Sequence, residues 1–120
     1  MSVPQFEVAA KRFGPRAVVT VSGELDIATA PPLSAVIALA MGSRPPELWI
    51  DLTPLTFIDS TGLTVLSTAY ARYDGALAII CPPGNVRRVF EIAGLAAFLP
   101  LCDGLESNGS ESREDSSQAV

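Results

Sequence analysis

The chain has 120 residues, of which 48% are hydrophobic, a mean hydropathy of +0.36 and a formal net charge of −5. This length supports one compact domain with its own core and is too short for two. No segment approaches the ~18 consecutive apolar residues of a membrane-spanning helix, and the first residues lack the basic-then-apolar order of a signal peptide. We therefore expect a cytoplasmic protein with no membrane association.

The negative charge is concentrated at the C-terminal end, because residues 1–102 hold 8 acidic and 7 basic side chains while residues 103–120 hold 5 and 1. A nearly neutral body without a basic stripe argues against a nucleic-acid groove. The end of the chain, DGLESNGSESREDSSQAV, is rich in Ser, Gly and acids, so burial cannot offset its ordering entropy. We predict a domain over residues 1–104 and a disordered acidic, Ser-rich tail over 105–120.

The first half of the body predicts a hairpin and a helix. Residues 6–12 and 17–23 are rich in β-branched or aromatic side chains and are separated by Gly14-Pro15. Thr29 is a candidate N-cap, and the prolines that follow it fit the first turn of a helix, where their missing N–H groups cost nothing. Apolar residues then recur at helical spacing up to Met41, and residues 42–46 end the helix.

The second half alternates strands and helices. Residues 48–52 and 76–81 are short apolar runs that predict buried strands. A helix is expected from Leu63 to about Tyr73, and Asp74-Gly75 ends it. Asn85 is the expected cap of a last helix that ends at Gly94, and residues 97–101 predict a short final strand.

Strands that alternate with helices after an opening hairpin indicate an α/β domain. We expect a mixed, mostly parallel sheet with helices packed against it and right-handed crossovers. Asp59-Ser60-Thr61-Gly62 then lies at a strand-to-helix turn, on the carboxyl edge of the sheet, where open α/β folds place their functional surfaces.

Several kinds of chemistry are excluded or disfavoured. The sequence has no His, so it cannot form a Ser-His-Asp triad, and it has no Gly-rich phosphate loop with Lys. A zinc site is not expected, and Cys81 and Cys102 predict reduced, buried thiols. Arg87-Arg88 could hold a phosphate, but a solvated helix face with Glu91 four residues after Arg87 is the favoured interpretation. We predict no catalytic residue, no metal and no cofactor.

Three segments together, VSGELDIATAPPL, DLTPLTFIDSTGLTVL and PPGNVRRVFEIAGL, resemble the STAS domain of free-standing bacterial anti-sigma factor antagonists. The resemblance covers roughly residues 6–101. Its central motif is Asp-Ser-(Ser/Thr)-Gly-Leu after an apolar strand, here at residues 59–63, with Gly-Glu-Leu-Asp upstream at residues 23–26. The chain departs from the family in having the Ser-rich tail where a final amphipathic helix is usual.

The resemblance implies that Ser60 is phosphorylated by the anti-sigma factor, which is itself a serine kinase, and that a PP2C-type phosphatase resets the switch. Unmodified, such a protein binds the kinase and frees a sigma factor; phosphorylated, it lets go. It is a substrate and not an enzyme. The implied partner-binding residues are Asp26, Asp59, Ser60, Thr61, Gly62 and Leu63.

The residues of the turn are compatible with this role and also with a simpler one. If Asp59 caps the helix, the Ser60 hydroxyl is left free at the first helical position, and Gly62 would let a partner's backbone come close. The simpler interpretation is a plain helix cap. Two other functions stay open: an accessory subunit of a transporter or lipid-trafficking complex that docks constitutively by the same face, and a nucleotide-binding module. The oligomeric state, monomer or weak dimer, is also open.

Overall fold

A computed structural model of the chain describes residues 5–104, and the structural statements below concern these residues. The predicted hairpin is formed by β1 (Glu7–Phe13) and β2 (Arg16–Leu25). The elements that follow are α1 (Ala30–Gly42), β3 (Glu47–Asp51), β4 (Leu55–Ile58), α2 (Ser60–Arg72), β5 (Ala76–Ile80), α3 (Asn85–Ile92) and β6 (Leu101–Cys102). The predicted α/β class with an opening hairpin is therefore confirmed.

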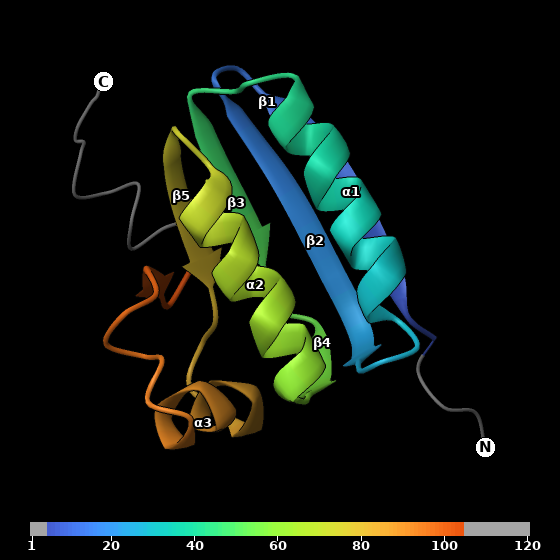
Figure 1. Cartoon of the computed structure of the whole chain (residues 1–120), viewed down its shortest axis with the longest axis vertical. Helices are drawn as coiled ribbons and strands as arrows, with labels where there is room; N and C mark the ends of the chain where they lie inside the picture. The colour runs from blue at the N-terminus through green and yellow to red at the C-terminus, as the bar shows by residue number, and fades with distance from the viewer. Residues whose placement is uncertain (1–4, 105–120) are drawn as a thin grey trace.

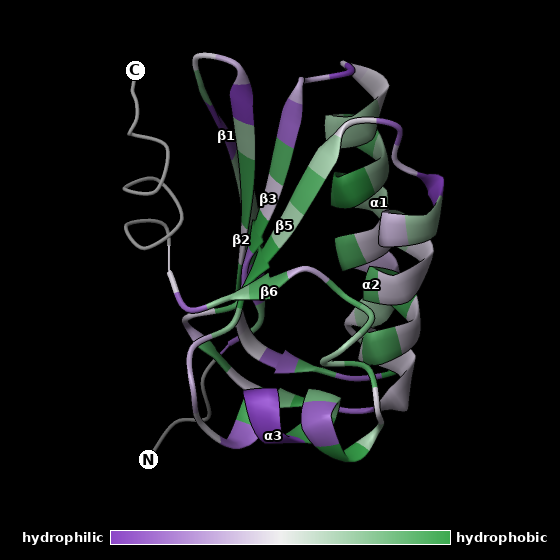
Figure 2. Ribbon diagram, turned by 90° about the vertical axis from the view of Figure 1, so that its left-hand side faces the viewer, coloured by the Kyte–Doolittle hydropathy of each residue, from purple (hydrophilic) through white to green (hydrophobic). Residues whose placement is uncertain are grey.

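The sheet has the strand order β1-β2-β3-β5-β6, and only β1 runs antiparallel to its neighbour. Helices α1 and α2 lie on one face of the sheet (Figure 1). Helix α3 lies at the end where the parallel strands finish (Figure 2). The main core fills the space between the sheet and α1 and α2, with fully buried side chains such as Val19, Leu33 and Ile50.

Strand β2 is long enough to pair with two strands along the same edge. Residues 16–20 of β2 pair with β3, and residues 23–25 pair with β4, both in parallel. Strand β4 was not predicted, because only Leu55 and Ile58 are buried, and this spacing of three is not the alternation of a half-buried strand. Its pairing with β2 carries the chain to the carboxyl edge, where Asp59 and Ser60 follow.

Four predicted features differ in detail from the structure. Helix α2 begins at Ser60, three residues before the expected Leu63, and the last strand is only Leu101–Cys102 because residues 95–99 form hydrogen-bonded turns. Thr29 occupies the N-cap position of α1, but its hydroxyl donates to the Glu24 carbonyl at 2.8 Å and bonds no helix amide. Asn85 is the first residue of α3 and not its cap, since its side-chain amide donates to the Thr56 carbonyl at 2.9 Å.

The face of the sheet turned away from the helices carries a second, smaller apolar cluster of Val18, Trp49 and Ile80. Within residues 5–104, no helix combines the length and the apolar character needed to cross a bilayer. The predicted tail lies outside the described residues.

Candidate functional site

The turn between β4 and α2 is closed by Asp59. Its carboxylate oxygen Oδ1 accepts the backbone N–H of Thr61 at 2.9 Å and that of Gly62 at 3.2 Å. These are two of the first N–H groups of α2, which have no partner within the helix. Asp59 is therefore the N-cap of α2, and Ser60 is its first helical residue.

The side chain of Ser60 is exposed, and its hydroxyl makes no hydrogen bond with any described residue. The Ser60 carbonyl is engaged, because it accepts the hydroxyl of Thr64 at 2.9 Å. The backbone of Ser60 is thus fixed by the helix while its hydroxyl faces solvent at the positive end of the helix dipole.

Asp26 lies beside this turn. In the parallel pairing of β2 with β4, Leu25 is opposite Ile58, and the N–H of Asp59 donates to the Leu25 carbonyl at 3.2 Å. Asp26 directly follows Leu25, and Asp59 directly follows Ile58. The Asp26 carboxylate accepts the backbone N–H of Ala28 at 3.0 Å, so it closes the turn before α1.

The structure corrects the explanation proposed for Gly62. A Cβ atom at this position would lie 2.7 Å from Cγ of Leu25 and 2.8 Å from Cγ1 of Ile58. Gly62 is buried and faces the core, so its missing side chain lets α2 pack closely against β2 and β4 and does not open the surface to a partner. Leu63 is also buried, at 7% exposure.

Two exposed apolar side chains at this edge were missed by the sequence analysis. Ile27 is 76% exposed in the turn after Asp26, and Phe57 is 45% exposed on β4. Ile27 stands in a polar turn, which is a signal that could have been recognised, whereas Phe57 belongs to the strand that was not predicted. The Ser60 edge is defined here as Asp26, Ile27, Phe57, Asp59, Ser60 and Thr61.

Arg87 is held by neighbouring groups rather than presented to a ligand. Its Nη1 donates to Asp103 at 2.7 Å and to the Cys81 carbonyl at 2.9 Å, and its Nε lies 3.9 Å from the Glu91 carboxylate. The expected i,i+4 contact with Glu91 is present, but the face is less solvated than predicted, because the Arg87 side chain is only 23% exposed. The second acid, Asp103, could not be foreseen from local spacing.

The two cysteines are not joined by a disulfide, and their side chains lie on opposite faces of the sheet. Cys81 is 1% exposed in the main core, whereas Cys102 is partly buried against the Trp49 cluster. Cys81 directly follows β5 and Cys102 ends the neighbouring strand β6, and the N–H of Cys81 donates to the Cys102 carbonyl at 2.8 Å. Because the side chains point to different faces, the sulfurs cannot meet. Burial raises the pKa of Cys81 to about 11 and also raises that of Cys102.

Comparison with known proteins places this geometry in a family. The STAS domain family model matches residues 7–108. An anti-sigma-B factor antagonist of Staphylococcus aureus is 31% identical over 91 residues, which cover 73% of this chain and 84% of the relative. A relative of the same description from Staphylococcus epidermidis is 30% identical over the same share of each chain.

Solved structures show the same fold. An anti-sigma factor antagonist from Mycobacterium paratuberculosis superposes with a TM-score of 0.83 at 29% identity, covering 91% of this chain and 95% of that one. The Bacillus cell fate determinant SpoIIAA in its phosphorylated form gives a TM-score of 0.64 at 21% identity, covering 92% and 100% of the two chains. The second likeness concerns the fold alone.

Proposed function

This chain belongs to the STAS domain family, and on that premise we propose that it is an anti-sigma factor antagonist controlled by phosphorylation of Ser60. In the unmodified state its Ser60 edge binds an anti-sigma factor that is a serine kinase, and the kinase then releases a sigma factor. Phosphorylation of Ser60 ends this binding.

One observation carries the proposal: the exposed hydroxyl of Ser60 has no hydrogen bond to a described residue although the backbone around it is fully fixed. A kinase needs a hydroxyl that can reach its active site without unfolding the substrate. The cap by Asp59 and the backbone pairing of β4 with β2 meet this need, because neither uses the Ser60 side chain.

Phosphate at Ser60 would change the surface more than the fold. A phosphoserine adds about −1.5 to −2 charge and three acceptor oxygens, and at the first residue of a helix it gains from the helix dipole. The same edge already carries the carboxylates of Asp26 and Asp59, so the added charge makes it strongly anionic. A partner that fits the neutral hydroxyl and the exposed Ile27 and Phe57 side chains of this edge would lose that fit through charge and bulk.

The proposal assigns this chain no catalysis of its own. The kinase supplies the phosphate-transfer step, and a PP2C-type phosphatase, the expected partner for the reverse step, restores the hydroxyl. The exchange takes place in the cytoplasm, where kinase, antagonist and sigma factor meet. Thr61 and the backbone of α2 border the modified residue, and Gly62 and Leu63 contribute from inside by holding α2 in position.

The test is a phosphorylation assay read by intact-mass spectrometry, with a serine kinase encoded beside the gene for this chain and ATP. We expect the wild-type chain to gain one phosphate, Ser60→Ala to gain none, and the matched control Thr61→Ala to gain one. Ser60→Ala should still bind the kinase, and Ser60→Glu should bind it at least about tenfold more weakly.

A phosphate on Ser60→Ala would contradict the assignment of Ser60. If no variant is phosphorylated and Ser60→Glu binds its partner as well as the wild type, the chain docks constitutively. That result would favour the accessory subunit of a transporter or lipid-trafficking complex over the partner switch.

A further inference from the structure

The edge of the sheet opposite Ser60 carries most of the arginines. Among residues 5–104, four of the six arginines lie at or just before the starts of the parallel strands β2, β3 and β5. These four are Arg12, Arg16, Arg44 and Arg72, and they are called the arginine edge. The carboxylates at this edge are Glu47 and Asp74. The arginine edge therefore has a local excess of positive charge.

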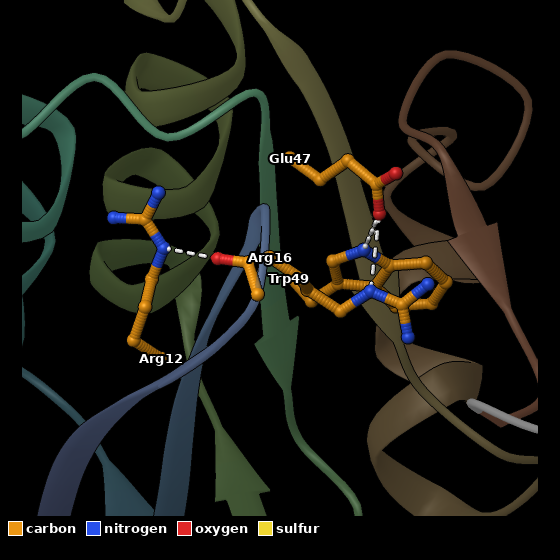
Figure 3. A network of polar contacts seen from close by, with 5 residues as sticks. Arg12, Arg16, Glu47 and Trp49 are labelled. Carbon is orange, nitrogen blue, oxygen red and sulfur yellow. Dashed lines mark hydrogen bonds and ion pairs between the residues drawn. The ribbon is translucent and has the colours of Figure 1, made fainter.

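The guanidinium group of Arg16 is already engaged in contacts within the domain. Its guanidinium carbon lies 4.2 Å from the centre of the Trp49 ring, and its Nε lies 3.0 Å from the Glu47 carboxylate (Figure 3). The same carboxylate oxygen accepts the indole N–H of Trp49 at 3.0 Å. The hydrogen bond from Trp49 and then the contact with Arg16 lower the pKa of Glu47, against the opposing effect of burial. Arg16 and Glu47 largely neutralise each other.

The other three arginines form no ion pair with a described residue. Arg12 turns away from the Arg16 network, and its Nε donates to the Gly14 carbonyl at 2.9 Å (Figure 3). Arg44 and Arg72 are exposed, and no hydrogen bond from either side chain to a described residue is found. Their guanidinium donors are therefore available to a ligand.

Arg44 and Arg72 line one hollow, of about 340 Å³, between the ends of α1 and α2. Met41 and Tyr73 form its apolar walls. A second, smaller groove of about 190 Å³ lies next to the hollow, between the two helices. It shares Met41 and Arg72 with the hollow and is otherwise lined mainly by small and apolar side chains. The dimensions suit a small charged group with an attached apolar part, rather than a protein surface.

The backbone around the hollow is held in place. Arg44 has a φ of 53°, a left-handed conformation that costs a non-glycine residue about 1 kcal/mol, and its N–H donates to the Met41 carbonyl at 3.0 Å. The Tyr73 hydroxyl donates to the Pro45 carbonyl, which ties the loop after α1 to the end of α2. The two arginines are thus attached to segments that are already fixed relative to each other.

The charge of the hollow favours an anion. Asp74 contributes one carboxylate to the lining, against the two guanidinium groups of Arg44 and Arg72. Arg72 also faces the negative end of the α2 dipole, an interaction of about 0.3–1 kcal/mol that leaves its N–H donors open. The planar forks of two arginines match the oxygen geometry of a phosphate group.

We propose that the hollow between Arg44 and Arg72 binds a phosphate group whose apolar substituent lies along the groove between α1 and α2. The phosphate can belong to a soluble phosphate ester or to a lipid headgroup, since both present the same oxygens. This site is at the opposite edge from Ser60, and it stands whether or not Ser60 is a phosphorylation site.

The first arm of the test titrates inorganic phosphate into the ¹⁵N-labelled chain at constant ionic strength, with chloride as the balancing anion. We expect saturable shifts of the backbone amides of residues 41–44 and 72–75, the non-proline residues around the hollow. Arg44→Gln and Arg72→Gln should each weaken binding at least about tenfold. The matched control is Arg88→Gln on α3, which makes the same charge change at the other end of the molecule and should leave the affinity within about twofold.

The second arm distinguishes the two sources, using vesicles of phosphatidylcholine with and without phosphatidic acid. If the chain sediments with vesicles that contain phosphatidic acid but not with vesicles of phosphatidylcholine only, and if Arg44→Gln and Arg72→Gln abolish this binding, the phosphate belongs to a lipid headgroup. Saturable binding of phosphate without sedimentation assigns a soluble ester. The proposal is overturned if neither arm shows binding, or if Arg88→Gln weakens binding as much as the other two variants, because the interaction would then reflect net charge only. The spectra of the free variants check that each one folds.

Discussion

Two strand-to-helix turns lie side by side at the carboxyl edge of the sheet, one after β2 and one after β4. Each is closed by an aspartate, Asp26 after Leu25 and Asp59 after Ile58. Asp59 directly precedes α2, and its carboxylate binds the amides of Thr61 and Gly62. Asp26 stands four residues before α1, and its carboxylate binds amides of the intervening turn, including that of Ala28. The same residue type closes a tight turn in one case and a wide turn in the other.

The width of the turn decides which side chain is displayed. The tight turn leaves no loop residue between cap and helix, so the group at the surface is the hydroxyl of Ser60. The wide turn has room for Ile27, which is 76% exposed. One edge therefore presents an exposed hydroxyl and an exposed apolar side chain. The two carboxylates at this edge, those of Asp26 and Asp59, accept hydrogen bonds from backbone amides.

The close packing of α2 below this turn depends on Gly62, and Gly62→Val tests it most severely. The new side chain would collide with Leu25 and Ile58, and we expect a loss of about 2–3 kcal/mol in the free energy of unfolding. Urea unfolding followed by the fluorescence of Trp49, the single tryptophan, measures it. The matched control is Gly42→Val at the end of α1, where a Cβ meets nothing within 4 Å and the change should stay within about 0.5 kcal/mol. Equal effects in both variants would show that α2 is not closely packed at this point.

The two aspartates should differ in their contribution to stability. Asp59→Ala removes the acceptor for two helix amides and should cost about 1–2 kcal/mol. Asp26→Ala should cost less, about 0.5–1 kcal/mol, because its carboxylate accepts amides of the turn before α1, and one of them, that of Thr29, also donates to the Asp26 carbonyl at 3.2 Å. The control Asp59→Asn keeps an acceptor oxygen and should recover most of the loss. If both alanine variants lose the same stability by urea unfolding, the difference between the turns is not energetic.

The displayed isoleucine should matter for binding and not for folding. Ile27→Ser is expected to weaken binding of the anti-sigma factor by about three- to tenfold, because it removes an apolar contact next to Ser60. Calorimetry or surface plasmon resonance measures the affinity, and urea unfolding should show a change below about 0.5 kcal/mol. Leu39→Ser, at an equally exposed position on α1, is the control that should bind normally. Unchanged affinity of Ile27→Ser would remove Ile27 from the proposed interface.

The smallest effect is expected from the end of the chain. Removal of residues 107–120 should leave the melting temperature and the affinity for the anti-sigma factor nearly unchanged, because this Ser-rich, acidic segment has little apolar surface to bury. A fall in melting temperature of more than about 4 °C, or roughly 1 kcal/mol for a domain of this size, would show that these residues contribute to the fold.

Local signals were sufficient to predict the hairpin, the order of the main elements and the turn at Asp59-Ser60. Strand β4 could not be predicted in this way, because its extended conformation depends on pairing with the distant strand β2. In that pairing Leu55 lies opposite Gly23. The inward direction of Gly62 depends on Leu25 in the same manner. The acidic partner Asp103 of Arg87 is 16 residues away, beyond any helical spacing. Features set by contacts between distant segments were the ones that sequence patterns missed.

The opposite orientation of the two thiols has a practical consequence. The sheet separates Cys81, which is enclosed in the main core, from Cys102, which is partly accessible on the other face. A maleimide dye should therefore react with Cys102 in preference to Cys81, at a pH high enough to offset the raised pKa of the Cys102 thiol. Since Cys102 packs against the cluster that contains Trp49, the dye would be a built-in energy-transfer acceptor for that tryptophan.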